Sequence, residues 1–401
     1  MASSSQYPRK PRVVQSVPGA FHHFDLAREL AARGNLERIF STFPWARLKR
    51  EDVPSELVST FPYVHPALMI LGRWGIDLPE SISWSLNWAN ANFFDHWVSR
   101  NVPPCDVIVA LSGSGLKSGR VVQSRGGKYV CDRGSSHIRF QSQIVTEEYR
   151  RWGVDIRPCD PRVIRREEEE YAQADAITVP SEFARRSFLE MGVSQDKVHK
   201  VPYGVRLENF TPVSEPPTNS FEVLFVGSVS FRKGIPYLLE AFERLAHPRK
   251  RLRIVGWVHK EIRPYLSNKL AENVEFMGII PQLELKQIMS SSHVMVLPSL
   301  EEGLALVQAQ ALASGCPLIS STNTGGSDLF THGVEGFEVP VRSVEAITER
   351  LQQLADEPLL QQRMRDAGIA KVRSLGGWQT YGEQYLSVLN QLVLNQQQIA
   401  V

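Results

Sequence analysis

Short apolar runs alternate along the chain with polar turns and with longer stretches of helix-forming residues. The apolar runs predict buried strands, and the stretches between them predict helices. Because the order strand, turn, helix returns many times, the pattern is typical of parallel sheets covered by helices, an α/β fold. The expected strands comprise residues 12–17, 105–111, 128–132, 176–179, 198–201, 222–226, 252–255, 273–276, 294–297 and 317–319.

The same pattern predicts two domains. A chain of 401 residues is long enough for two hydrophobic cores. Residues 211–219 carry prolines and small polar residues without periodicity, which predicts a linker. Residues 1–11 have no apolar core and predict a floppy tail rather than a signal peptide. We therefore expect a first domain at 12–210 and a second domain at 220–385.

One unit, "VMVLPSLEEGLALVQAQALASGCPLISS" at 294–321, predicts a strand, a turn, a helix over 304–313 and another strand. Ligands of open α/β sheets bind at the carboxyl ends of strands, where a glycine lets the backbone come close. Glu302 lies at such an end, and Gln310 follows eight residues later, about 12 Å along a helix. That length matches a nucleotide-sugar from its sugar to its ribose. The alternative is an ordinary strand–helix unit with a solvated Glu302.

The unit resembles the signature of retaining glycosyltransferases of family 4, "PS…EG-F-G-L…EA-A-GxPV", in which seven residues separate two glutamates. Glu302 matches the first glutamate. Gln310 replaces the second, and Ala305 stands where the family usually has glycine. The likeness extends over about residues 12–389.

A second block, "GSVSFRKG", follows strand 222–226 and resembles the family's Gly-Arg…Lys-Gly loop. Lys233 matches the lysine, and Ser228 replaces the arginine. Arg232 is the candidate to supply the missing charge, since a diphosphate needs cations beside a flexible loop.

The resemblance implies the glycosyltransferase-B architecture: two Rossmann-like domains facing across a cleft, with residues 386–401 crossing back to the first domain. It places a nucleotide-sugar donor on the second domain. Glu302 is then the catalytic residue that holds the donor sugar. The implied donor-binding residues are Lys233, Arg232, Gly227 and Ser228 at the diphosphate, Phe276 and Met277 at the base, the backbone of Gly303, Leu304, Ala305 and Leu306 at the leaving group, and Gln310 at the ribose.

On the acceptor side, the resemblance points to the loop after the first strand, with Gly19 and His22, and to Asp132 and Arg133 after strand 128–132. The family usually has a histidine after that strand, facing the donor sugar. His137 is the nearest histidine but stands several residues later. It is a catalytic candidate, and the alternative is a histidine that caps or packs the loop.

Two further stretches have open or bland interpretations. Residues 43–97 hold five of the eight tryptophans, including Trp74, which fits either a helical insertion with its own aromatic core or a surface for acceptor or membrane. The charged run at 165–174 predicts a solvated helix face. The loop "SGSGLKSG" lacks P-loop spacing, which excludes an NTPase.

Composition adds mainly exclusions. The formal net charge of +2 demands no nucleic-acid partner. The four cysteines form no CxxC pair and indicate reduced thiols, and no DxD or histidine-rich metal pattern is present. No run approaches the roughly 18 apolar residues of a membrane span. We expect a cytoplasmic protein, with peripheral membrane contact left open.

These observations favour a metal-independent retaining glycosyltransferase without a cofactor. Its donor would be a UDP-, GDP- or ADP-sugar, and its acceptor the hydroxyl of a glycan, a lipid-linked or a small molecule. Ser228, Ala305 and Gln310 depart from the family pattern and keep a catalytically impaired binding or scaffold protein as the alternative. A nucleotide-sugar epimerase of the same architecture is a second alternative.

Overall fold

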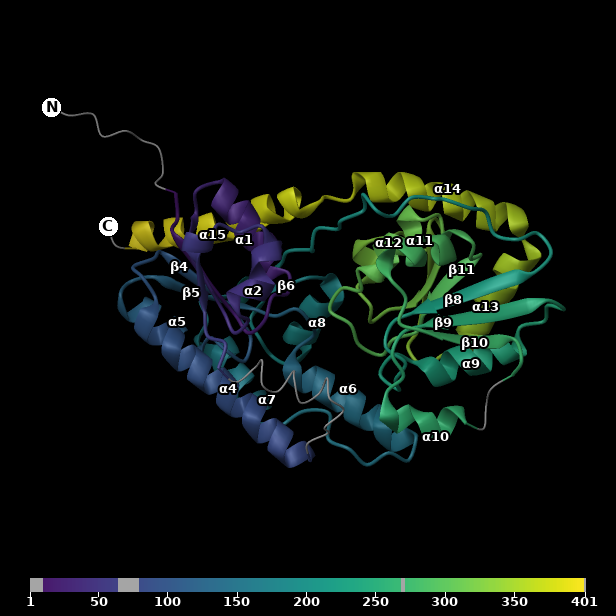
Figure 1. Cartoon of the computed structure of the whole chain (residues 1–401), viewed down its shortest axis with the longest axis horizontal. Helices are drawn as coiled ribbons and strands as arrows, with labels where there is room; N and C mark the ends of the chain where they lie inside the picture. The colour runs from purple at the N-terminus through teal and green to yellow at the C-terminus, as the bar shows by residue number, and fades with distance from the viewer. Residues whose placement is uncertain (1–9, 64–78, 268–270, 400–401) are drawn as a thin grey trace.

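The computed structural model describes residues 10–63, 79–267 and 271–399. Trp74 and most of the predicted tail lie outside these residues. The chain forms two α/β units that lie side by side, the first drawn in purple to teal and the second mainly in green (Figure 1). No helix in the described ranges combines the length and the apolar character needed to cross a membrane.

The first unit is built on a seven-stranded parallel sheet with the order β3-β2-β1-β4-β5-β6-β7. Its central strands are buried on both faces, which explains why the sequence shows them as continuous apolar runs. The strands are β1 (Val13–Val17), β2 (Leu36–Ser41), β3 (Val58–Thr60), β4 (Val107–Leu111), β5 (Lys128–Asp132), β6 (Ala176–Val179) and β7 (Val198–Lys200).

Helices cover this sheet on both faces. They are α1 (His23–Ala32), α2 (Trp45–Leu48), α4 (Glu80–Asn101), α5 (Leu116–Ser124), α6 (Ile138–Arg151), α7 (Pro161–Gln173) and α8 (Glu182–Glu190), with 3-10 turns at Lys49–Glu51, Ser55–Leu57 and Gln195–Lys197. Within the aromatic stretch, Trp97 packs edge-on against Phe40 with ring centroids 5.3 Å apart, and Phe94 is fully buried, whereas Phe93 is exposed.

The charged run predicted as a solvated face is largely buried, so that prediction was wrong. It forms α7, where Glu170 is fully buried and Glu167 nearly so. The Glu170 carboxyl group accepts hydrogen bonds from the backbone N–H groups of Gly113 and Gly115, at 2.5 and 2.9 Å. The glycine-rich loop after β4 is therefore filled by an internal acid, and the run is charged because the loop needs a partner.

The second unit has a six-stranded parallel sheet with the order β10-β9-β8-β11-β12-β13. Its strands are β8 (Phe221–Val226), β9 (Lys250–Val255), β10 (Val274–Gly278), β11 (Val294–Leu297), β12 (Leu318–Ser321) and β13 (Gly336–Val339). Its helices are α9 (Ile235–Arg244), α10 (Arg263–Leu266), α11 (Gln282–Ser290), α12 (Val307–Ala313), α13 (Val344–Asp356) and α14 (Pro358–Ser374), with 3-10 turns at Lys260–Ile262 and Gly326–Asp328.

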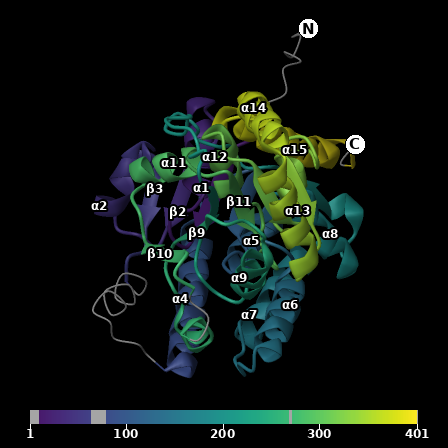
Figure 2. The ribbon, with the colours of Figure 1, turned by 90° about the vertical axis from the view of Figure 1, so that its right-hand side faces the viewer.

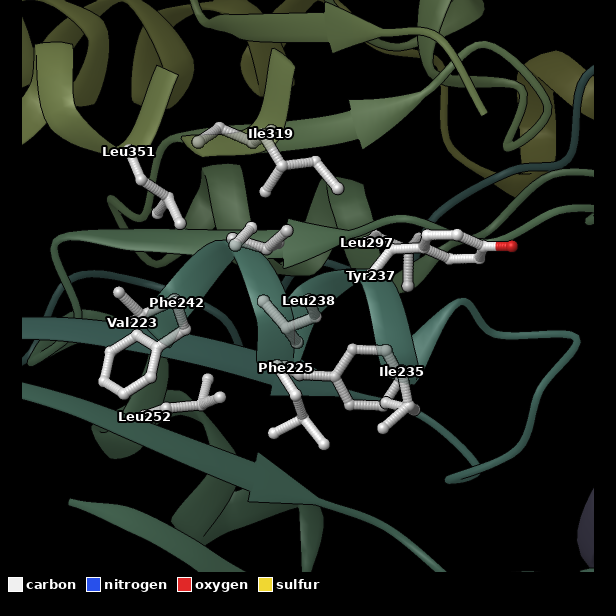
Figure 3. Close-up of a cluster of buried hydrophobic side chains, with 14 of the residues drawn as sticks. Val223, Phe225, Ile235, Tyr237, Leu238, Phe242, Leu252, Leu297, Ile319 and Leu351 are labelled. Carbon is white, nitrogen blue, oxygen red and sulfur yellow. The ribbon is translucent and has the colours of Figure 1, made fainter. Parts of the chain in front are cut away.

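The core of the second unit lies between this sheet and the helices α9 and α13 (Figure 3). Val223 and Phe225 point from β8 toward Leu238 on α9, and Leu351 comes from α13. All four side chains are fully buried. This apolar contact holds rigid the strand whose carboxyl end carries Lys233, because burial of large apolar side chains is the main stabilising contribution.

The last helix, α15 (Trp378–Ile399), returns to the first unit. It follows α14 across the top of the molecule in both ribbon views (Figures 1 and 2). Tyr381, Tyr385 and Leu389 are buried in the first unit's core, beside α1. The segment that packs on the first unit thus begins near Trp378, eight residues before the predicted 386–401.

Candidate active site

Lys233 and Glu302 form an ion pair at the junction of the two units. Lys233 follows β8 and Glu302 follows β11, and these strands are hydrogen-bonded neighbours, so the loops at their carboxyl ends adjoin. Both side chains are mostly buried, with 12% and 15% of their surfaces exposed. The structure thus brings together the two residues on which the sequence-based site depends.

Two glycines make this contact sterically feasible. Gly234 has a φ of 70°, and a Cβ on it would lie 2.1 Å from the carbonyl oxygen of Pro298. A Cβ on Gly303 would lie 2.0 Å from the carbonyl oxygen of Gly134, which belongs to the first unit. Neither position accepts a side chain without backbone movement. Gly303 therefore packs directly on the loop that follows β5.

Burial is the main cause that lowers the pKa of Lys233, to about 7, and the Arg232 charge acts in the same direction. Glu301 and the touching Glu302 carboxylate favour the charged amine and oppose this shift. The ammonium group is therefore easily lost in the absence of an anion and easily regained beside one.

Arg232 faces Glu301 rather than open space. Its guanidinium donates to the carbonyl oxygen of Glu301 at 2.9 Å and to its Oε2 at 3.2 Å. Glu301 is fully buried and also accepts from Ser136 Oγ at 2.8 Å and Gln141 Nε2 at 2.7 Å, both in the first unit. Glu301 thus ties the two units together and occupies the charge that Arg232 was expected to offer a diphosphate.

Glu301 keeps its charge in this environment. Burial alone would raise its pKa, but Arg232 and the hydroxyl and amide donors lower it below the usual value. The sequence analysis missed this residue, because a Glu-Glu pair does not reveal which carboxylate turns inward. Its partners lie about 160 positions earlier in the chain.

The backbone of 303–306 is loop rather than helix, since α12 begins only at Val307. The Ala305 N–H donates to the carbonyl oxygen of Thr324 at 3.1 Å, and the Glu302 N–H donates to that of Asn323 at 2.9 Å. The predicted helix over 304–313 was therefore too long. Ala305 does not offer a free N–H to a leaving group.

The other donor-side candidates lie around the same edge of the second sheet. Gly227 ends β8, and its N–H donates to the carbonyl oxygen of Val255 at the end of β9. Phe276 and Met277 lie at the carboxyl end of β10 and pack into different clusters. The remaining candidates are placed as follows: Ser228 directly after Gly227, Leu304 and Leu306 packed into the apolar cluster beside α12, and Gln310 half-buried on α12.

The acceptor-side candidates His22 and Asp132 are in contact. His22 Nε2 lies 2.5 Å from Asp132 Oδ2, and Nε2 of the adjacent His23 lies 3.3 Å from the same oxygen. Thr178 Oγ1 donates to Asp132 Oδ1 at 2.6 Å. Gly19 closes the neighbouring turn with a φ of 107°, and its carbonyl oxygen accepts from the Ser41 hydroxyl. The group lies where β1, β5 and β6 end.

His22, His23 and Asp132 are also the one set of histidine, cysteine or acidic side chains in the described ranges whose ligand atoms lie within 4.8 Å of one another. Both Asp132 oxygens already have protein partners, His22 and Thr178. The carboxylate is thereby satisfied, and the three side chains form a hydrogen-bonded group rather than an open coordination shell.

Arg133 and His137 point into the first unit. Arg133 lies 2.9 Å from Glu167 and donates to Gln141 at 2.8 Å. His137 is the N-cap of α6: its Nδ1 accepts from the Arg139 N–H at 3.2 Å, and its ring packs against Tyr171. Burial lowers the pKa of His137 to about 4. This is the geometry of the capping alternative, and it leaves His137 no free nitrogen at Glu302.

With this geometry described, comparisons with known proteins become informative. Residues 20–209 match the family model described as Glycosyltransferase Family 4, and residues 208–371 match that described as Glycosyl transferases group 1. Together they span both sheets and the junction between them.

The chain belongs to glycosyltransferase family 4.

Curated relatives of this family-4 chain share part of their length with it. It is 26% identical over 238 residues to the GDP-mannose-dependent monoacylated alpha-(1-6)-phosphatidylinositol monomannoside mannosyltransferase of Corynebacterium glutamicum, covering 54% of this chain and 62% of that protein. It is 28% identical over 173 residues to the glycogen synthase of Mycobacterium tuberculosis, covering 41% of each. The match thus spans less than two thirds of either relative.

Solved structures cover almost the whole chain. The sucrose-phosphate synthase of Thermosynechococcus elongatus has a TM-score of 0.71 at 21% identity, over 96% of this chain and all of that one. The Anabaena protein HepE, solved in complex with UDP and glucose, has a TM-score of 0.66 at 15% identity, over 95% of this chain and all of that one. The predicted glycosyltransferase-B architecture is confirmed.

Proposed function

We propose that this protein is a retaining glycosyltransferase that moves a sugar from a nucleotide-sugar to an acceptor hydroxyl without a metal ion. The observation that carries the proposal is the Lys233–Glu302 contact at the carboxyl ends of β8 and β11. It places a cation and a carboxylate together where the two domains meet. The sugar nucleotides named for the relative and the solved neighbour, GDP-mannose and UDP with glucose, support this donor class.

The donor diphosphate takes the place of Glu302 on Lys233. A diphosphate carries more charge than a carboxylate, so it is the stronger partner for the amine and restores its proton. Lys233 then stabilises the negative charge that develops on the leaving group, as preorganised cations do in a site without water. Once released from Lys233, Glu302 turns to the hydroxyl groups of the donor sugar.

Domain movement accompanies binding. Gly303 packs on Gly134, and Glu301 holds Ser136 and Gln141 of the first domain. A nucleotide-sugar therefore enters when these contacts open and is enclosed when they reform. Enclosure excludes water, which protects the activated sugar from hydrolysis.

Donor binding and reaction type are tested separately. Thermal shift and calorimetry with UDP-glucose, GDP-mannose and ADP-glucose should reveal one nucleotide class that stabilises the protein in proportion to its occupancy. Proton NMR of the product formed with a panel of alkyl glycosides, in the presence of EDTA, should then show the donor's anomeric configuration. No binding of any nucleotide would refute the proposal, inversion or EDTA sensitivity would correct its mechanism, and binding without turnover would favour the binding-protein alternative.

A further inference from the structure

His22 has a side chain whose position its helix does not explain. It is the N-cap residue of α1, but its side chain caps no backbone N–H group. Instead Nε2 reaches Oδ2 of Asp132 at 2.5 Å. Since a carboxylate only accepts, Nε2 carries the proton and Nδ1 keeps a free lone pair. Within the described ranges no hydrogen bond reaches this Nδ1, and 12% of the His22 side chain is exposed.

Asp132 is built to stay charged. It is 5% exposed, and it accepts from Thr178, whose hydroxyl also contacts that of Tyr385 on α15 at 2.8 Å. Burial alone would raise its pKa, but His22, His23 and the Thr178 hydroxyl lower the pKa of Asp132 to about 2. A fixed carboxylate on one imidazole nitrogen holds the ring in one tautomer and stabilises the imidazolium that forms when the other nitrogen takes a proton.

The dyad of His22 and Asp132 lies next to the donor-side loop. A Cβ on Gly134 would be 3.6 Å from Cε1 of His22, and Gly134 is the residue on which Gly303 packs. His22 and the Glu302–Gly303 turn therefore flank the same backbone segment from opposite domains. The tyrosine ring of Tyr203 stacks on His22 at 4.3 Å and limits its rotation.

We propose that His22 is the general base that takes the proton of the acceptor hydroxyl and that Asp132 is its positioning residue. This inference rests on the proposed transferase function. As the acceptor O–H bond breaks, its proton passes to Nδ1 of His22 and its oxygen bonds to the anomeric carbon. The bond from that carbon to the diphosphate breaks, and its electron pair leaves with the diphosphate. The imidazolium later releases its proton to water.

The groups around His22 leave its imidazole free to act in this way. His23 adds no charge, because burial lowers its pKa to about 3. Asp25 on α1 is paired with Arg206 at 2.8 Å. The titratable and charged groups that face His22 are His23 and Asp25 on α1, Asp132 and Arg133 at the end of β5, Tyr203 and Arg206 after β7, and Tyr381 and Tyr385 on α15.

The test compares His22→Gln and Asp132→Asn with His332→Gln, an exposed histidine of the second domain that serves as the matched control. Glutamine still donates to Asp132 but offers no basic nitrogen. The assay is release of UDP from UDP-glucose or of GDP from GDP-mannose, with water as the acceptor, between pH 5 and pH 9. Calorimetry with UDP and GDP gives the nucleotide affinity of each variant.

We expect wild type to lose rate toward acidic pH, because a protonated His22 accepts no further proton. His22→Gln should lower kcat by about 10²–10⁴-fold and abolish that acidic limb, with nucleotide affinity unchanged. Asp132→Asn should lower kcat and shift the limb, and His332→Gln should change nothing. An unchanged rate and pH profile in His22→Gln would overturn the proposal, and so would loss of nucleotide binding, which would assign His22 to the architecture. A wild type that binds no nucleotide would instead refute the proposed function.

Discussion

The two sides of the cleft hold their charges in opposite ways. On the donor side, Lys233 and Glu302 satisfy only each other, and the lysine is poised to exchange its proton. On the acceptor side, Asp132 is fixed by several donors from β6 and α1. A pair that must part when a substrate arrives is built from few contacts. A group that must orient a neighbour throughout the reaction is built from many.

The largest effect should come from the donor-side carboxylate. Glu302→Gln keeps the size of the side chain but removes the charge that supports the reacting sugar, and we expect turnover to fall by about 10²–10³-fold. Initial rates of nucleoside diphosphate release measure this. Glu349→Gln, an exposed change on α13, is the control. Near-normal turnover in Glu302→Gln would remove its assigned role.

The next effect concerns stability. Glu301→Gln leaves Arg232 without its charge partner in a buried network, and breaking such a pair costs about 3 kcal/mol of unfolding free energy. Chemical denaturation followed by circular dichroism gives this value, with Glu349→Gln again as control. A midpoint equal to that of wild type would show that Glu301 does not hold the two domains together.

The donor-side lysine should give donor affinity a pH dependence. Below pH 7 the amine is already charged, but above pH 7 the ligand-free amine loses its proton and binding must supply one. Affinity for the diphosphate should therefore fall up to about tenfold per pH unit above pH 7. Calorimetry between pH 6 and pH 9 measures the slope. Lys233→Arg should flatten it, because guanidinium stays charged. A flat profile in wild type would contradict the exchange.

The smallest effect is expected at Gln310. A carboxylate accepts from both ribose hydroxyls and adds a charge-assisted component, so Gln310→Glu should tighten donor binding a few-fold, roughly 1 kcal/mol. The dissociation constant of UDP or GDP measures this. Gln362→Glu, on the outer helix α14, is the matched control. Unchanged or weaker affinity would exclude the ribose role.

Continuous apolar runs revealed the buried strands well: 128–132, 176–179 and 294–297 agree with the structure residue for residue. Strand β2 was missed, because Glu37 and Arg38 interrupt its apolar character. The helix expected from 304 begins at Val307, because Ala305 hydrogen-bonds to a distant loop rather than to its own turn. Propensity alone carries no information about such a partner.

The candidate site divides along the same line. Motif spacing identified Lys233 and Glu302, which do meet, because each follows a strand whose position the pattern predicts. It missed Glu301 and left His137 between two roles, since both depend on partners far away in the sequence. Side-chain direction in a loop is decided by tertiary contacts.

The carboxyl group of Glu170 has a consequence for how a two-sheet protein discriminates between its own halves. Each sheet presents a glycine-bearing turn with backbone donors, so a phosphate-rich ligand meets two comparable landing places. In the first sheet the chain has seated its own acid there, permanently and out of reach of solvent. Self-occupancy of one berth gives the molecule its polarity: traffic of nucleotides is directed to one side before any ligand contact selects it.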